Sequence, residues 1–289
     1  MIQVKDGNEI EINISKNDLV FGDISAISHF SAKNVISSGG DSESMIWTIT
    51  TPSDNFTFRI GGQTGASYNN YDVDWGDGNS ETGITTVNKE HTYATAGLYE
   101  IKVTGSIYIR NIQTASADAY TEWKQWGTNT QVTGFREWFN GCKNMTYSAT
   151  DSPNFALIGS LSYTGIYRSF YNTQAITSLD LSGWDVSTLA GIGQQAFSFM
   201  KNAVSVNISN WDLSGITTWT NAFQSLGQST TNGCDFTAPN VNISNATSIS
   251  QIFINSALKT IDVSNWQLRS AGVNICLLYT SPSPRDDEL

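Results

Sequence analysis

The chain has 289 residues, with 15 Lys and Arg against 26 Asp and Glu, so its formal net charge is −11. Binding to nucleic acid or to an anionic membrane surface needs clusters of Lys and Arg, and this acidic chain argues against both. It has no run of roughly 18 apolar residues, so we expect no membrane insertion. The length predicts about two domains.

The N-terminal segment, residues 1–46, has little pattern. Its first residues (MIQVKDG) lack the apolar core of a signal peptide. Over residues 9–15 polar side chains alternate with Ile, which predicts a strand. Residues 37–44 (SSGGDSES) predict a linker. We therefore assign residues 1–46 to a strand segment and a linker.

Residues 47–107 show the alternation of apolar and polar side chains that is typical of antiparallel strands with one buried face. The alternating segments start at Trp47, Phe56, Tyr71 and Tyr99. Turns are predicted where Gly, Asn and Asp gather, at residues 61–62, 77–79 and 96–97. Several short strands at this spacing predict a β-sandwich.

Two motifs make this prediction more specific. Residues 72–78 (DVDWGDG) are followed by residues 91–103 (HTYATAGLYEIKV). The pair resembles PKD-type domains, in which an aromatic-Gly-Asp-Gly turn precedes a His-Thr-Tyr strand. The resemblance implies an immunoglobulin-like sandwich, with Trp75 between its sheets, that serves as a spacer or binding module without an active site.

Ionisable residues in this half offer one candidate metal site. Asp72, Asp74 and Asp77 could hold Ca²⁺ through their oxygens, or they could face water and cap backbone groups. His29 and His91 have no partner at zinc-ligand or catalytic-triad spacing. We interpret His91 as a strand residue of the motif and expect no cofactor.

The second half repeats itself. Residues 179–184 (LDLSGW) recur at 206–211 (VNISNW) and 261–266 (IDVSNW), with a degenerate copy at 234–239 (CDFTAP). The copies start 27, 28 and 27 positions apart. Each one predicts a short strand with two side chains inward and two outward.

A phenylalanine recurs between these strands. Four of the phenylalanines have an apolar residue four positions earlier, a spacing that places both on one face of a short helix. Each unit is then a strand, a turn and a helical segment, which buries its apolar side only by stacking on its neighbours, with the rings in one continuous column. The recurring residues are Phe139, Phe170, Phe197, Phe223 and Phe253, and the preceding ones are Phe135, Ile166, Trp219 and Ile249.

This second pattern resembles the BspA-like leucine-rich-type surface repeats of bacteria. Residues 139–145 (FNGCKNM) fit the Phe-x-Gly-Cys end of such a unit, and residues 122–127 (EWKQWG) resemble the opening that joins a PKD-like module to the repeats. The resemblance covers about residues 120–270. Pro239 and the long loop at 227–233 depart from it, and they predict a kink or bulge in the third unit.

The outward positions of the repeat strands suggest a binding site. Stacked parallel strands lie ~4.8 Å apart, so we expect a ladder of Asp180, Asn207, Asp235 and Asp262. The ladder could recruit a cation or sugar hydroxyls, with Trp184, Trp211 and Trp266 as stacking platforms. Alternatively, the Asx and Ser side chains cap the strand ends, and the Trp rings pack the stack.

The end of the chain differs from the rest. Residues 276–286 (CLLYTSPSPRD) can be back-translated into a string that resembles a transposase adapter of sequencing libraries. We therefore expect residues 276–289 to be non-native and the repeats of residues 108–275 to be a truncated set. Cys142 and Cys234 then remain, and we interpret both as small apolar core residues.

Together these patterns predict a mainly β protein with short helices, an immunoglobulin-like β-sandwich followed by a strand/short-helix solenoid. The two resemblances imply a non-catalytic, extracellular or cell-surface adhesion protein that binds a glycan or a cell-surface protein. The sequence has no nucleophile-elbow, P-loop or dinucleotide motif. Two alternatives stay open: a virion fibre or decoration protein of a phage, and the non-catalytic flank of a truncated secreted hydrolase.

Overall fold

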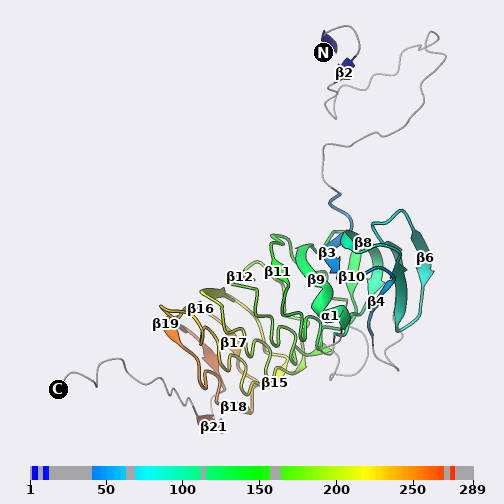
Figure 1. The fold of residues 1–289 in the computed structure, drawn as a ribbon. Coiled ribbons are helices and arrows are strands. Elements are labelled where there is room, and N and C mark those ends of the chain that lie inside the picture. The colour runs from blue at the N-terminus through cyan, green and yellow to red at the C-terminus, as the bar shows by residue number, and fades with distance from the viewer. Residues whose placement is uncertain are drawn as a thin grey trace. The chain divides into compact units, whose positions relative to one another are not determined.

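The computed structural model describes residues 2–5, 9–12, 41–62, 69–111, 115–156, 164–269 and 274–276. The chain forms two compact units, residues 1–40 and 41–289. In the first, β1 (Ile2–Lys5) and β2 (Glu9–Ile12) pair as an antiparallel hairpin with Ile2 opposite Ile12 (Figure 1). The strand predicted from residue 9 is thus confirmed as far as Ile12, and residues 13–40 lie outside the described residues.

The second unit begins with a mixed sheet of seven strands. Their order is β11-β9-β3-β8-β5-β6, with β10 paired to β8. Most neighbours are antiparallel, whereas β10 and β11 run parallel to their partners. The seven strands are β3 (Met45–Thr51), β5 (Asn70–Asp74), β6 (Ser80–Ile84), β8 (Gly97–Ile107), β9 (Tyr120–Gln125), β10 (Thr130–Val132) and β11 (Thr146–Tyr147).

A second, two-stranded sheet packs against this one. It pairs β4 (Phe56–Ile60) with β7 (Lys89–Tyr93), and the short helix α1 (Ala115–Ala119) precedes β9. The Phe58 ring of β4 meets Tyr120 of β9 edge-on at 5.4 Å. The four predicted strand segments are all strands. The Trp75 ring is fully buried and stacks at 4.8 Å on His91 of β7.

The sheet and the repeats share one hydrophobic core. Strands β9, β10 and β11 come from the segment that the sequence assigns to the repeats, yet they extend the sheet of residues 45–107. Their buried rings continue into the repeats: Trp123 contacts Phe139 at 4.9 Å, and Phe139 contacts Phe170 at 5.0 Å. The boundary between residues 107 and 108, where the sequence places the end of the sandwich and the start of the repeats, therefore falls inside one compact unit.

Beyond β11 the chain winds as stacked coils of a β-solenoid, whose short strands pair in parallel from coil to coil (Figure 1). The repeating, mainly β architecture that the sequence predicts is confirmed. The first row is β12 (Ser178–Asp180), β14 (Ser205–Asn207), β16 (Cys234–Thr237) and β19 (Leu258–Asp262). The second is β13 (Gly191–Ile192), β15 (Ile216–Thr218), β18 (Ser248–Ser250) and β21 (Asn274–Cys276), and the third is β17 (Asn242–Ile243) and β20 (Gln267–Leu268).

The expected phenylalanine column is present. Successive ring centroids from Phe139 to Phe253 are 5.0, 5.2, 5.1 and 5.4 Å apart. The last three pairs are stacked within 17° of parallel. From Phe170 onward each ring therefore contacts the next coil through its face, and the column forms the centre of the solenoid core.

The helical segment predicted around each phenylalanine is wrong. Around Phe170, the amides of Arg168, Phe170 and Asn172 donate to carbonyls of the next coil at 2.7–3.2 Å, not to carbonyls four residues back. Arg168 and Asn172 have positive φ angles of 51° and 61°, which an α-helix excludes. The i, i+4 spacing thus reflects a repeated turn, closed by hydrogen bonds between coils.

The alignment of the third repeat also needs correction. Pairing places Phe236 between Val206 and Ile261, so the equivalent strand starts lie 27, 30 and 25 residues apart. Val241, not Pro239, therefore stands where the other copies have Trp. The predicted irregularity is confirmed, because the register shifts between Cys234 and Asp235.

The remaining expectations concern cysteines and membrane contact. Cys142 and Cys234 are both buried and unbridged, as expected. Burial raises the pKa of the Cys234 thiol to about 12, which suits an inert core residue.

Within the described ranges there is no helix long and apolar enough to cross a bilayer. Strand β21 ends at Cys276, and residues 277–289 of the expected adapter-derived tail lie outside the described part.

Candidate functional site

The predicted polar ladder forms only in part. Strand pairing brings Asp180 opposite Asn207, then Thr237, then Asp262. Asp235 is not in this row; it pairs with Ser205 and Thr260, two positions away. The expected ladder with three carboxylates is therefore wrong, because the register puts Thr237 in the place expected for Asp235.

The ladder side chains are engaged in their own turns. Asp180, Asn207 and Asp262 each accept a hydrogen bond from the amide two residues later, at 2.9–3.0 Å. Asp235 accepts from the Thr260 hydroxyl at 2.7 Å and from the Lys259 ammonium at 3.2 Å. The hydrogen bonds from Thr260 and Lys259 lower the pKa of Asp235. The contacts of Asp180, Asn207 and Asp262 are the capping arrangement that Asx residues make in turns, and they occupy one side-chain oxygen of each residue.

The tryptophans proposed as stacking platforms pack the solenoid instead. Trp184 is 6% exposed and Trp211 is 1% exposed, and the two rings stack on each other at 6.1 Å. Trp211 Nε1 donates to the carbonyl of Leu181 at 2.7 Å. Trp266 is half-buried, donates to Ala238 O and packs against Trp219. Neither Trp184 nor Trp211 offers a ring face to a ligand.

The acidic cluster of the first half is also committed to local contacts. Asp72 accepts from the amide of Gly83 at 2.8 Å, and Asp74 accepts from the amide of Gly76 at 2.9 Å. Asp77 accepts from the Asn79 amide, and its second oxygen lies 2.7 Å from His91 Nε2. In the part of the chain that the structure describes, no three His, Cys, Asp or Glu side chains converge as metal ligands do. The geometry therefore supports the capping interpretation of these residues.

Asp77 and His91 tie the two sheets of the N-terminal half together. Burial would raise the pKa of Asp77, but the hydrogen bonds to His91 and Asn79 outweigh burial and lower it below its ordinary value. A carboxyl group with a lowered folded-state pKa stabilises the fold above its unfolded pKa, and that contribution is lost as the pH falls through the folded pKa.

We expect Asp77→Asn to lower the free energy of unfolding by about 1–3 kcal/mol at pH 7, the usual effect of removing a hydrogen bond to a charged group. The difference from wild type should shrink below about pH 4, where the unfolded chain is protonated. Urea unfolding at pH 7, 5 and 3 measures this. Asp118→Asn is the control, because its carboxylate is exposed and pairs with Lys143 at 3.0 Å; its effect should be below about 1 kcal/mol. A difference for Asp77→Asn that is equal at pH 3 and pH 7 would contradict the linkage.

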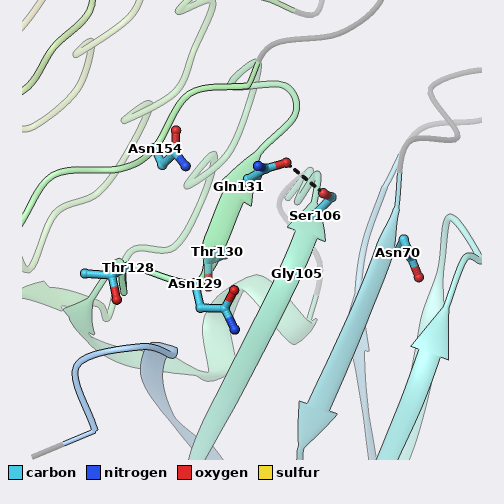
Figure 2. A pocket seen from close by; sticks show the side chains of 8 residues that line it. All are labelled: Asn70, Gly105, Ser106, Thr128, Asn129, Thr130, Gln131 and Asn154. Carbon is cyan, nitrogen blue, oxygen red and sulfur yellow. Dashed lines mark hydrogen bonds between the residues drawn. The ribbon is translucent and has the colours of Figure 1, made fainter.

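A pocket of about 270 Å³ opens at the end of the sheet where the last residues of β8 lie between β5 and β10. Figure 2 shows side chains from the three strands and two loops around it. Ser106 of β8 donates to Gln131 Oε1 of β10 at 3.1 Å, which fixes one wall. The lining residues are Asn70, Gly105, Ser106, Thr128, Asn129, Thr130, Gln131 and Asn154.

The chemistry of this pocket is uniform. All of its side chains are neutral amides or hydroxyls, which donate and accept hydrogen bonds as sugar hydroxyls do. Asn70, Asn129 and Asn154 are exposed, and none of them makes a side-chain hydrogen bond to another described residue. The lining contains no ionisable side chain for acid–base chemistry. The arrangement therefore suits reversible recognition of a hydroxyl-rich ligand.

The sequence predicted neither the pocket nor the surface formed by basic and aromatic side chains on the first coils. The pocket residues come from four separate segments, and no local pattern marks them. A row of basic and aromatic side chains on the first coils was visible in residues 165–171 (GIYRSFY), but it was interpreted only through the phenylalanine period.

Comparison of the chain with protein-family models, with curated proteins and with solved structures gives no match. Inference about its role therefore starts from the pocket, the solenoid surface and the two sequence resemblances.

Proposed function

We propose that this chain is a non-catalytic binding protein of the cell surface or extracellular space that recognises a glycan or a cell-surface protein. The observation that carries the proposal is the pocket between β5, β8 and β10, whose lining is neutral and rich in amides. Amide groups on rigid strands are suited to sugar hydroxyls, because each amide offers both a donor and an acceptor. The Asx ladder is the weaker candidate, since one side-chain oxygen of Asp180, Asn207 and Asp262 is already held in a turn.

The domain identities belong to the same proposal. The fully buried Trp75, the Gly76–Gly78 turn and the facing two-stranded sheet support a PKD-like sandwich. The stacked coils, with one phenylalanine each, support BspA-like repeats. Both modules present binding surfaces on a rigid scaffold, which agrees with an adhesion role.

The double variant Asn70→Ala/Asn154→Ala tests the pocket. Both side chains are exposed, so we expect the fold to be unchanged and binding to the best wild-type ligand to weaken at least about fivefold, given ~0.5–1.5 kcal/mol per hydrogen bond. A glycan array, followed by titration of the strongest binder and by a cell-binding assay, measures the effect.

The matched control is Gln228→Ala/Asn232→Ala, which removes two exposed amides from a loop of the coils. This variant should bind as wild type does. Equal binding by the pocket variant and wild type would remove the pocket from the proposal, and an absence of both glycan and cell binding by the wild-type chain would refute the function.

A further inference from the structure

The first coils carry a continuous line of cationic and aromatic side chains, which we call the basic-aromatic row. The Arg136 guanidinium lies 4.3 Å from the ring centre of Tyr167, and Arg168 lies 5.1 Å from Tyr167 and 5.0 Å from Tyr171. Tyr171 contacts Phe199 at 5.2 Å, and the Lys201 ammonium lies 5.8 Å from the Phe199 ring. The row consists of Arg136, Tyr167, Arg168, Tyr171, Phe199 and Lys201, and all six are half-buried.

The backbone of the coils produces this row. Arg168 and Phe199 have φ angles of 51° and 63°, at the turns on either side of the buried phenylalanines. Hydrogen bonds between coils hold the turns in register: Glu137 N donates to Tyr167 O, and Phe199 N donates to Gln224 O. Because successive coils are ~4.8 Å apart, the row places its charged groups along a line that crosses three coils, roughly 10–15 Å long.

The row is positive in an acidic chain. Among the described residues, the carboxylate that contacts it is Glu137, whose side chain is 5% exposed. Glu137 is already paired with Arg110, at 2.6 Å from Arg110 Nε to Oε2. In the described part of the chain, Arg168 and Lys201 make no salt bridge to a carboxylate, and Arg136 pairs with Glu137 at 3.5 Å. The row is therefore net positive in a chain whose net charge is −11.

Stacking preorganises the cations. A guanidinium that lies over an aromatic ring uses its flat face for that contact and keeps its N–H groups in the plane for hydrogen bonds. Arg168 Nε donates to Gln195 Oε1 at 2.7 Å, and its two terminal nitrogens carry four more N–H donors. Fixed, planar donors of this kind match the two oxygens of a carboxylate.

We propose that the basic-aromatic row binds a linear polysaccharide whose sugar units carry carboxylates. Cations on three successive coils match a polymer that carries many charges along its length, and the half-buried Tyr171 and Phe199 rings suit the apolar faces of sugar rings. A single-stranded nucleic acid also pairs cations with aromatic rings, so binding of oligothymidylate is measured as a competing outcome of the test below. The row shares no residue with the amide-lined pocket, so this inference rests on glycan recognition as the proposed function but does not depend on that pocket.

The test uses the full chain and three uronic-acid polymers, polygalacturonate, alginate and hyaluronan, titrated by calorimetry at low salt. We expect the chain to bind at least one of them, to bind its carboxyl-reduced form at least about tenfold more weakly, and to lose affinity as NaCl is raised. The double variant Arg168→Gln/Lys201→Gln should weaken binding about tenfold or more. Gln is already the residue at the positions equivalent to Arg168 in two other coils, Gln195 and Gln251, which have the same positive φ.

The control Lys143→Gln/Lys259→Gln makes the same change in net charge with two exposed lysines outside the row, and its affinity should stay within about twofold of wild type. Binding to none of the three polymers, equal binding of the carboxyl-reduced polymer, equal losses in the two double variants, or tighter binding of oligothymidylate would each overturn the proposal. The pocket variant Asn70→Ala/Asn154→Ala should retain binding to the acidic polymer, which separates a failure of the row from a failure of the pocket.

Discussion

Replacing Phe197 with Ala is expected to lower the free energy of unfolding by about 3–5 kcal/mol, the range for removing a buried aromatic side chain. Phe197 is 1% exposed and stacks on Phe170 at 5.2 Å and on Phe223 at 5.1 Å. Its ring also contacts Trp211 at 6.0 Å. The cavity cannot close easily, because hydrogen bonds between coils fix the backbone on both sides, at Phe197 N to Ala222 O and at Phe170 N to Ala196 O.

Urea unfolding followed by far-ultraviolet circular dichroism measures this loss. Phe197→Leu is the first control, and it should cost less than Phe197→Ala because it leaves a smaller cavity. Phe199→Ala is the second, because this ring is two residues away but half-buried, and we expect a loss below about 1.5 kcal/mol. Losses of similar size for Phe197→Ala and Phe199→Ala would show that the ring column is not the core of the solenoid.

The second large effect is expected in the turn that follows Trp75. Gly76 has a φ of +79°, and a Cβ added there would lie 2.3 Å from the carbonyl oxygen of Glu100. The Ala side chain is strained in this conformation and also collides with backbone of β8, which has no flexible group to move aside. We expect Gly76→Ala to cost about 3 kcal/mol or more, as the sum of backbone strain and overpacking.

Gly78, in the same turn, provides the matched comparison. Its φ is +92°, but a Cβ added there would meet nothing within 4 Å. Gly78→Ala therefore carries the conformational cost alone, about 1–2 kcal/mol. Thermal unfolding of the two variants side by side measures the difference. Equal thermal unfolding midpoints for Gly76→Ala and Gly78→Ala would mean that the Gly76 backbone does not pack against β8 as described.

The sequence was informative wherever a side chain had to recur. The spacing of Phe170, Phe197 and Phe223 predicted their column, because stacked coils share a core only when matching rings return at each turn. The alternation around Phe58 and Val73 predicted strands for the same reason: one face had to be buried.

The sequence misled where the backbone took an uncommon conformation. The i, i+4 apolar pairs predicted helices, but non-glycine residues such as Arg168, Gln195 and Gln251 adopt positive φ there, and no propensity scale marks them for it. The third repeat was aligned two residues out, since Asp235 imitates the Asx of the other copies while Phe236 is the residue in register. An error of two keeps the inward and outward faces, so side-chain patterning could not reveal it.

The candidate site was less predictable than the fold. Asp180 and Asp262 are exposed, as expected, but their hydrogen bonds to their own turns depend on local geometry that one sequence does not show. The pocket depends on the parallel pairing of β10 with β8, a long-range contact without a local signal.

Because each coil is hydrogen-bonded mainly to the coil before it and the coil after it, the gene for this region can change length in whole repeats. Recombination between the codons of two neighbouring phenylalanines would delete a segment and bring together rings that already match in size and orientation. Loss of a single codon inside a strand would instead turn every following side chain of that strand to the opposite face. Selection should therefore tolerate variation in repeat number among descendants of this gene far more readily than small deletions within a repeat.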